Sequence, residues 1–71
     1  MGMYGKRIRE LREERDMTQA ELAKELHVSQ ITVSRFELEQ HDLGTQMIIK
    51  ICDIFDVSAD YLLGREDEKF R

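Results

Sequence analysis

Apolar residues recur every third or fourth position in each segment of this chain, and no segment sustains the alternation typical of a β-strand. This spacing gathers apolar side chains on one face of an α-helix. The chain has no proline, and glycines and short polar clusters separate the periodic segments. The pattern therefore predicts an all-α fold built from five short helices.

Capping residues mark where these helices begin and end. Thr18 and Glu21 have the Thr-x-x-Glu spacing of a capping box, and Ser29 and Ser58 are candidate N-caps. Gly64 follows the last apolar pair, where a left-handed glycine commonly ends a helix. The expected helices span approximately residues 4–15, 18–26, 29–37, 45–55 and 59–63.

A chain of 71 residues makes one domain, and at this size only about 60% of the unfolded surface is buried. Cys52 is the single cysteine, so an internal disulfide is excluded and a reducing, cytoplasmic environment is expected. Cys52, His27 and His41 lack the spacing of a zinc site, and we expect no cofactor. A second copy of the chain is the remaining source of added stability.

Negative charge is concentrated in the second half of the chain. Residues 1–37 contain seven basic and seven acidic groups, whereas residues 38–71 contain four basic and eight acidic groups, which accounts for the net charge of −4. A locally positive face in the first half is compatible with this balance. No apolar run approaches the roughly 20 residues that span a bilayer, so no membrane partner is expected.

Wound into a helix, residues 28–37, VSQITVSRFE, would have two different sides. Val33 and Phe36 fall on one side, and short polar groups with one arginine cover the rest. A protruding helix of this kind fits the major groove of DNA, where every base pair presents a distinct pattern of donors and acceptors. The alternative is a solvated helix surface.

Residues 18–37, TQAELAKELHVSQITVSRFE, resemble the helix-turn-helix of phage Cro and repressor-type transcriptional regulators. The similarity extends from GKRIRELREERDMTQAELA to IIKICDIFDVSADYLLG and so covers residues 5–64. It implies a compact five-helix, lambda-repressor-like DNA-binding domain over residues 1–64, with the helix-turn-helix in the second and third helices. Residues 65–71 are then a charged tail, expected to fray, or the start of a linker in a longer regulator.

The resemblance also implies roles for single residues. Base contacts fall to Gln30, Ile31, Ser34 and Arg35, because glutamine suits adenine, isoleucine a thymine methyl group and arginine guanine. Phosphate contacts fall to Thr18, Gln19, Ser29 and Thr32. Arg12 and Glu37 correspond to a buried structural ion pair. Arg7, Arg9 and Arg15 are instead expected on a solvated face, paired with neighbouring glutamates.

Two positions depart from the family pattern. His27 stands where the turn usually has glycine, and it is expected to take a positive φ, which histidine tolerates better than most residues. Glu39 and Asp42 lie in a loop where relatives often have basic residues that bind phosphate. Each lost phosphate contact weakens DNA affinity.

The expected function is a sequence-specific DNA-binding transcriptional regulator, most simply a repressor, that binds a pseudo-palindromic operator as a homodimer. The candidate dimer residues are Ile49, Tyr61, Leu62 and Phe70, with scattered exposed apolar side chains as the alternative. The rival function is a protein–protein interaction module of anti-repressor or antitoxin type. No phosphate loop, nucleophile triad or metal cluster indicates an enzyme or a small-molecule substrate.

Overall fold

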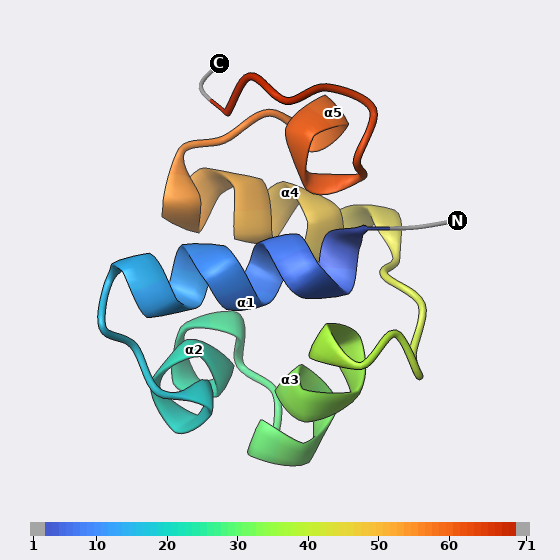
Figure 1. The fold of residues 1–71 in the computed structure, drawn as a ribbon. Helices are drawn as coiled ribbons and strands as arrows, with labels where there is room; N and C mark the ends of the chain where they lie inside the picture. Colours follow the sequence, from blue (N-terminus) through green and yellow to red (C-terminus); the bar gives the residue numbers. More distant parts are fainter. Residues whose placement is uncertain (1–2, 70–71) are drawn as a thin grey trace.

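The structure, a computed structural model, describes residues 3–69, and its regular elements are α-helices (Figure 1). They are α1 (Tyr4–Glu14), α2 (Gln19–Leu26), α3 (Gln30–Glu37), α4 (Thr45–Phe55) and α5 (Ala59–Leu62). The prediction of an all-α fold with five helices is confirmed, and each helix boundary agrees to within about a residue. None of the helices in residues 3–69 has the length and apolar composition needed to cross a membrane.

The predicted caps explain why the helices begin where they do. The Thr18 hydroxyl accepts a hydrogen bond from the Glu21 amide at 3.0 Å, and the Glu21 carboxylate accepts one from the Thr18 amide at 2.8 Å. The hydroxyls of Ser29 and Ser58 each accept a bond from an amide three residues later. These bonds satisfy donors that the first turn of a helix leaves without a partner. Gly64 has a φ of 81°, as expected for a residue that ends a helix.

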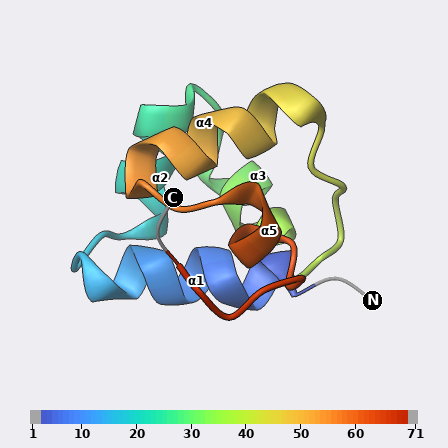
Figure 2. The ribbon, with the colours of Figure 1, turned by 90° about the horizontal axis from the view of Figure 1, so that it is seen from above.

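The helices form two groups on either side of α1. In Figure 1, α1 runs across the molecule with α2 and α3 below it and α4 and α5 above it. Seen from above, α1 and α4 lie along two sides of the molecule with α5 between them (Figure 2). The most deeply buried side chains, which tie all five helices and the α4–α5 turn into one core, are Ile8, Leu22, Leu26, Val33, Ile51, Val57 and Leu62.

The N-terminal end of α1 lies unusually close to the C-terminal end of α3. A Cβ atom added to Gly5 would stand 2.4 Å from the Glu37 carbonyl oxygen and 2.9 Å from that of Phe36. Only glycine permits this backbone approach. The Glu39 carboxylate also accepts a hydrogen bond from the Gly5 amide at 3.1 Å, which supplies a partner for the start of α1.

Two of the residues predicted at a dimer interface belong to the core instead. Tyr61 is 7% exposed and Leu62 is 0% exposed, so neither can meet a second copy. The prediction was wrong because α5 is a short helix that turns both side chains inward, where the Tyr61 ring packs against the Arg7 guanidinium. Ile49 is 50% exposed on α4 and stays available. Phe70 lies outside the described residues.

Arg7 was expected on a solvated face, but the structure buries it. Its guanidinium donates to the carbonyl oxygens of Tyr61 at 2.9 Å and Glu66 at 2.7 Å and lies 4.1 Å from the centre of the Tyr61 ring. The sequence did contain a signal, because Arg7 follows Tyr4 by three positions and precedes Leu11 by four and thus lies on the apolar face of α1.

Residues 65–69, here called the C-terminal strap, fold back over α1 and α5. The Lys69 ammonium forms a 2.7 Å ion pair with Glu14 at the end of α1, and the Lys69 carbonyl accepts a bond from the Ser58 amide at 3.0 Å. The expectation of a frayed tail was therefore wrong for these residues. Backbone and ion-pair contacts hold the strap in place, and neither kind leaves a periodic mark in the sequence.

Candidate nucleic-acid interface

Helix α3 presents one side to the core and the other to solvent. Val33 and Phe36 are buried and anchor the helix against α2 and α1. Gln30, Ile31 and Arg35 are exposed, and Ile31 keeps 64% of its surface open. Leaving a large aliphatic side chain in water costs free energy relative to burying it, so its position on the exposed face is a feature to be explained.

The turn between α2 and α3 directs this exposed face outward. His27 has a φ of 59°, which is the left-handed conformation expected from its place in the turn. The following amide, of Val28, donates to the Ala23 carbonyl at 3.0 Å and closes the end of α2. Ser29 then caps α3 through the Thr32 amide. The chain thus turns over residues 27–29 and starts α3 directly after this turn.

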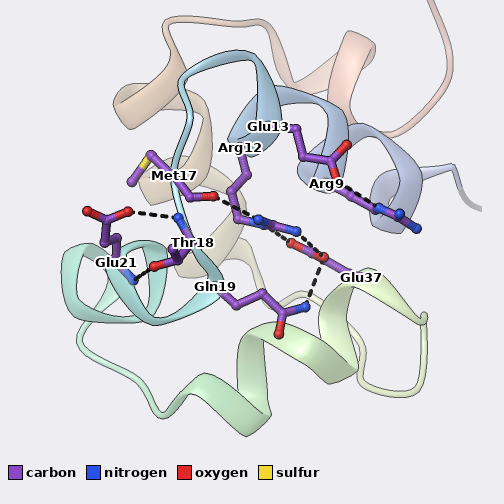
Figure 3. A network of polar contacts seen from close by, with 8 residues as sticks. All are labelled: Arg9, Arg12, Glu13, Met17, Thr18, Gln19, Glu21 and Glu37. Carbon is purple, nitrogen blue, oxygen red and sulfur yellow. Dashed lines mark hydrogen bonds and ion pairs between the residues drawn. The ribbon is translucent and has the colours of Figure 1, made fainter.

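A network of polar contacts joins α1, α2 and α3 behind this face (Figure 3). Arg12 Nε donates to Glu37 Oε2 at 2.7 Å, and Arg12 Nη2 donates to Glu37 Oε1 at 3.1 Å. The third donor of Arg12, Nη1, reaches the Met17 carbonyl at 2.7 Å. The Arg12 and Glu37 side chains are only 12% and 5% exposed, and their hydrogen bonds raise the pKa of the Arg12 guanidinium above its ordinary value.

Gln19 belongs to the same network, which the sequence alone did not indicate. Its amide nitrogen donates to Glu37 Oε1 at 3.1 Å, so one carboxylate oxygen accepts from both Gln19 and Arg12. The partners are 18 residues apart in the chain. Their contact depends on how α2 crosses α3, which no local pattern encodes.

A polar hollow of about 250 Å³ opens over this network. It lies where α1, α2 and the end of α3 meet, and it is lined by Arg9, Arg12, Glu13, Gln19, Ser34, Glu37 and Leu38. Sequence reasoning assigned Arg9 only to a solvated face, and its predicted pairing with a glutamate is present as a 3.2 Å contact to Glu13. The structure adds that Arg9 lines the same hollow as Gln19 and Ser34, two residues predicted to contact DNA.

The residues predicted to contact phosphate lie at the start of α2 and α3. Thr18 and Ser29 are exposed N-caps, while Gln19 and Thr32 are partly buried. The hydroxyls of Ser29 and Thr32 are 2.9 Å apart and share a hydrogen bond. The N-terminus of a helix favours negatively charged groups, because its unpaired amide N–H groups point outward and the helix dipole is positive at that end. These four side chains therefore lie in the first turns of two helices, positions that suit an anionic backbone.

The acidic loop after α3 turns one of its two carboxylates away from this region. Glu39 has a φ of 58° and directs its side chain to the Gly5 amide at the start of α1. The Tyr4 hydroxyl donates to the His41 carbonyl at 3.2 Å, and burial, followed by the charges of Asp42 and Glu39, raises the pKa of Tyr4. Glu39 thus has a structural partner within the chain, although both Glu39 and Asp42 are exposed.

Comparison with known proteins gives matches over nearly the whole chain. The chain is 35% identical over 63 residues to the HTH-type transcriptional regulator ImmR of Bacillus subtilis (strain 168), covering 89% of this chain and 50% of ImmR. It is 36% identical over 64 residues to the antitoxin PezA of Streptococcus pneumoniae serotype 4, covering 90% of this chain and 40% of PezA. The chain thus spans half or less of the length of these relatives.

A solved structure shares the fold. The P22 c2 repressor, in complex with synthetic operator 9T, superposes with a TM-score of 0.83 and 27% identity, covering 93% of this chain and 100% of the repressor chain. Residues 8–62 match the helix-turn-helix family, and that range contains α2, the turn and α3 together with most of α1 and all of α4 and α5. The chain therefore belongs to the helix-turn-helix family of phage Cro and repressor type.

Proposed function

We propose that this chain is a sequence-specific DNA-binding transcriptional regulator, a repressor, that inserts α3 into the major groove. The observation that carries the proposal is the exposed face of α3, on which polar side chains and Ile31 stand on a helix anchored by Val33 and Phe36. An α-helix fits the major groove of B-DNA, and the repressor with the same fold was solved with its operator.

The proposed contacts follow the chemistry of the exposed side chains. Gln30 reads adenine, Ile31 packs against a thymine methyl group, and Arg35 donates to guanine, with Ser34 at the edge of the groove. The phosphate contacts come from the residues at the two helix starts, Thr18, Gln19, Ser29 and Thr32. The two groups have different roles. Base contacts determine the sequence preference, and phosphate contacts determine the position of the protein on the duplex.

A homodimer on a pseudo-palindromic operator suits the size of the molecule. Two recognition helices that enter successive major grooves lie about 34 Å apart. The molecule measures 28 × 24 × 19 Å, so two copies at that spacing can touch each other. Of the original dimer candidates among the described residues, Ile49 on α4 is the exposed one, and we place it at the contact between the two copies.

The test begins with a selection of bound fragments from a random DNA pool, followed by fluorescence titration at two salt concentrations. Arg35→Ala should weaken binding to the selected site by about 1–3 kcal/mol and relax the preference at one base pair. The control is Arg65→Ala, which removes the same charge from an exposed position just after α5 and should leave the preference intact. A uniform loss would make Arg35 a phosphate contact.

Failure of the parent chain to bind any DNA at low salt would contradict the regulator. That result would favour the protein–protein interaction module, for which the acidic loop and the similarity to an antitoxin are the supporting observations.

A further inference from the structure

The orientation of the Gln19 amide is determined by chemistry as well as by geometry. An ionised carboxylate only accepts hydrogen bonds, so the amide nitrogen and not the oxygen must face Glu37. Figure 3 shows the nitrogen directed at Glu37 and the oxygen directed away from it. A glutamine without such a partner could present either end to a ligand.

Glu37 is itself held too firmly to follow the Gln19 side chain. Both of its oxygens accept bonds from Arg12, and the third Arg12 donor is bound to the Met17 carbonyl just before the Thr18 cap. The carboxylate is almost fully buried, and a partner in such a pair cannot move without leaving a buried charge. Glu37 therefore provides an immobile acceptor for the side chain of Gln19, the first residue of α2.

The amide nitrogen of Gln19 has two hydrogens, and Glu37 accepts only one of them. The second is left for a ligand at the hollow that Gln19 shares with Arg9 and Ser34. A phosphate oxygen is an acceptor and would be repelled by the amide oxygen of a flipped glutamine. Fixing the amide removes the wrong orientation before DNA arrives and reduces the side-chain entropy lost on binding.

We propose that Glu37 is a positioning residue for DNA binding: held by Arg12, it orients the Gln19 amide so that the free N–H donates to a backbone phosphate at the hollow. This inference rests on the proposed function and deepens it. It gives the Arg12–Glu37 pair a second task beyond holding α1 and α3 together, and it connects the buried pair to the DNA surface through a single side chain.

The first test is a double-mutant cycle of Gln19→Ala and Glu37→Gln. Glutamine at position 37 keeps the shape but has one acceptor oxygen, which the Arg12 donors would occupy. Binding to the selected duplex and to a random duplex is measured at one salt concentration, at a temperature where circular dichroism shows every variant folded. Gln19→Ala should weaken both complexes about fivefold in the parent and less than twofold in the Glu37→Gln background.

The cycle separates positioning from support of the fold. If Glu37 only stabilised the fold, Gln19→Ala would cost the same factor in both backgrounds, and that result overturns the inference while leaving the regulator intact. An unchanged affinity for Gln19→Ala in the parent also overturns it. No DNA binding by the parent overturns the proposed function and the inference together.

A second measurement needs no variant that could fail to fold. In the free parent protein, the two side-chain amide protons of Gln19 should have widely separated NMR shifts and slow hydrogen exchange, because one of them is bound to a buried carboxylate. The exposed Gln30 and Gln46 are internal controls and should show ordinary glutamine shifts. Ordinary shifts for Gln19 would refute the fixed orientation.

Discussion

Two arginines of α1 form hydrogen bonds to elements on opposite sides of this helix. Arg7 binds the end of α5 and the C-terminal strap, whereas Arg12 binds Glu37 of α3 and the joint that leads into α2. Burying a charge is costly unless its hydrogen bonds are supplied. Within the described residues, no buried side-chain nitrogen or oxygen lacks a partner. The two arginines are tolerated inside because each donates three hydrogen bonds to carbonyl or carboxylate oxygens.

Arg12→Ala should lower the free energy of unfolding by about 3–5 kcal/mol, because it leaves the buried Glu37 carboxylate without its counter-ion. Thermal unfolding followed by circular dichroism measures the loss. Arg9→Ala is the matched control on the same helix, since its contact with Glu13 is exposed and should be worth less than about 1 kcal/mol. Equal losses for the two variants would contradict the assignment of a special structural role to Arg12.

At the scale of elements, the packing of α1 on α3 depends on the absence of a side chain at Gly5. The backbones meet there so closely that no other residue fits without a shift. A glycine inside a helix normally costs up to about 1 kcal/mol relative to alanine. Here the close approach outweighs that cost, because it sets how α1 supports the end of α3 where Glu37 lies.

Gly5→Ala should therefore destabilise the fold by about 1–3 kcal/mol, although alanine is the better helix former. Gly44→Ala is the control, because nothing lies within 4 Å of a Cβ at that position and the expected loss, below about 1 kcal/mol, is the preference for glycine over alanine at an N-cap. Urea unfolding of the two variants gives the comparison. A gain in stability for Gly5→Ala would mean that α1 can shift away from α3 at little cost.

The helices were predictable from sequence because their signals are local. Thr18, Ser29 and Ser58 cap helices through residues three positions ahead. The left-handed turn at His27 was expected from the family resemblance, in which glycine usually occupies that position. The contact of Gln19 with Glu37 is different in kind, since it joins residues 18 positions apart. That the partly buried Gln19 side chain is held by a distant partner was therefore beyond the sequence.

The fifth helix shows the same limit. Its N-cap was predictable, but the inward direction of Tyr61 depends on Arg7 lying over its ring at 4.1 Å. The apolar face of α1 marks Arg7 as a candidate for burial, but the sequence does not show what Arg7 binds, because its partner carbonyls lie 54 and 59 residues away.

For the molecule as a whole, the fold keeps most of the acidic second half of the chain apart from α2 and α3. The acidic second half supplies α4, α5 and the strap, which lie on one side of α1 in Figure 1, while α2 and α3 lie on the other. The net charge of −4 therefore repels an anionic ligand at α3 less than the total suggests. The reason is that interactions between exposed charges are screened over about 8–10 Å at physiological salt.

Removing residues 65–71 should lower stability by about 1–3 kcal/mol, because Arg7 loses the Glu66 carbonyl and the Asp67 carboxylate, and Glu14 loses Lys69. The preferred DNA sequence should not change. Glu68→Ala, an exposed substitution in the same segment, is the control and should stay within about 0.5 kcal/mol of the parent. An unchanged unfolding midpoint for the shortened chain would show that the strap contributes nothing.

The position of the strap has a practical consequence. Lys69 is held at the end of α1 and beside the start of α5, so α1 stands between it and the recognition helix. Under the proposed binding mode, a fluorophore, a biosensor surface or a reporter enzyme attached at Lys69 would start from the side of α1 opposite α3. Immobilised or fused forms of the molecule should thus keep α3 open, whereas coupling through the exposed Lys24 of α2 would place the attachment on the half of the molecule that carries α3.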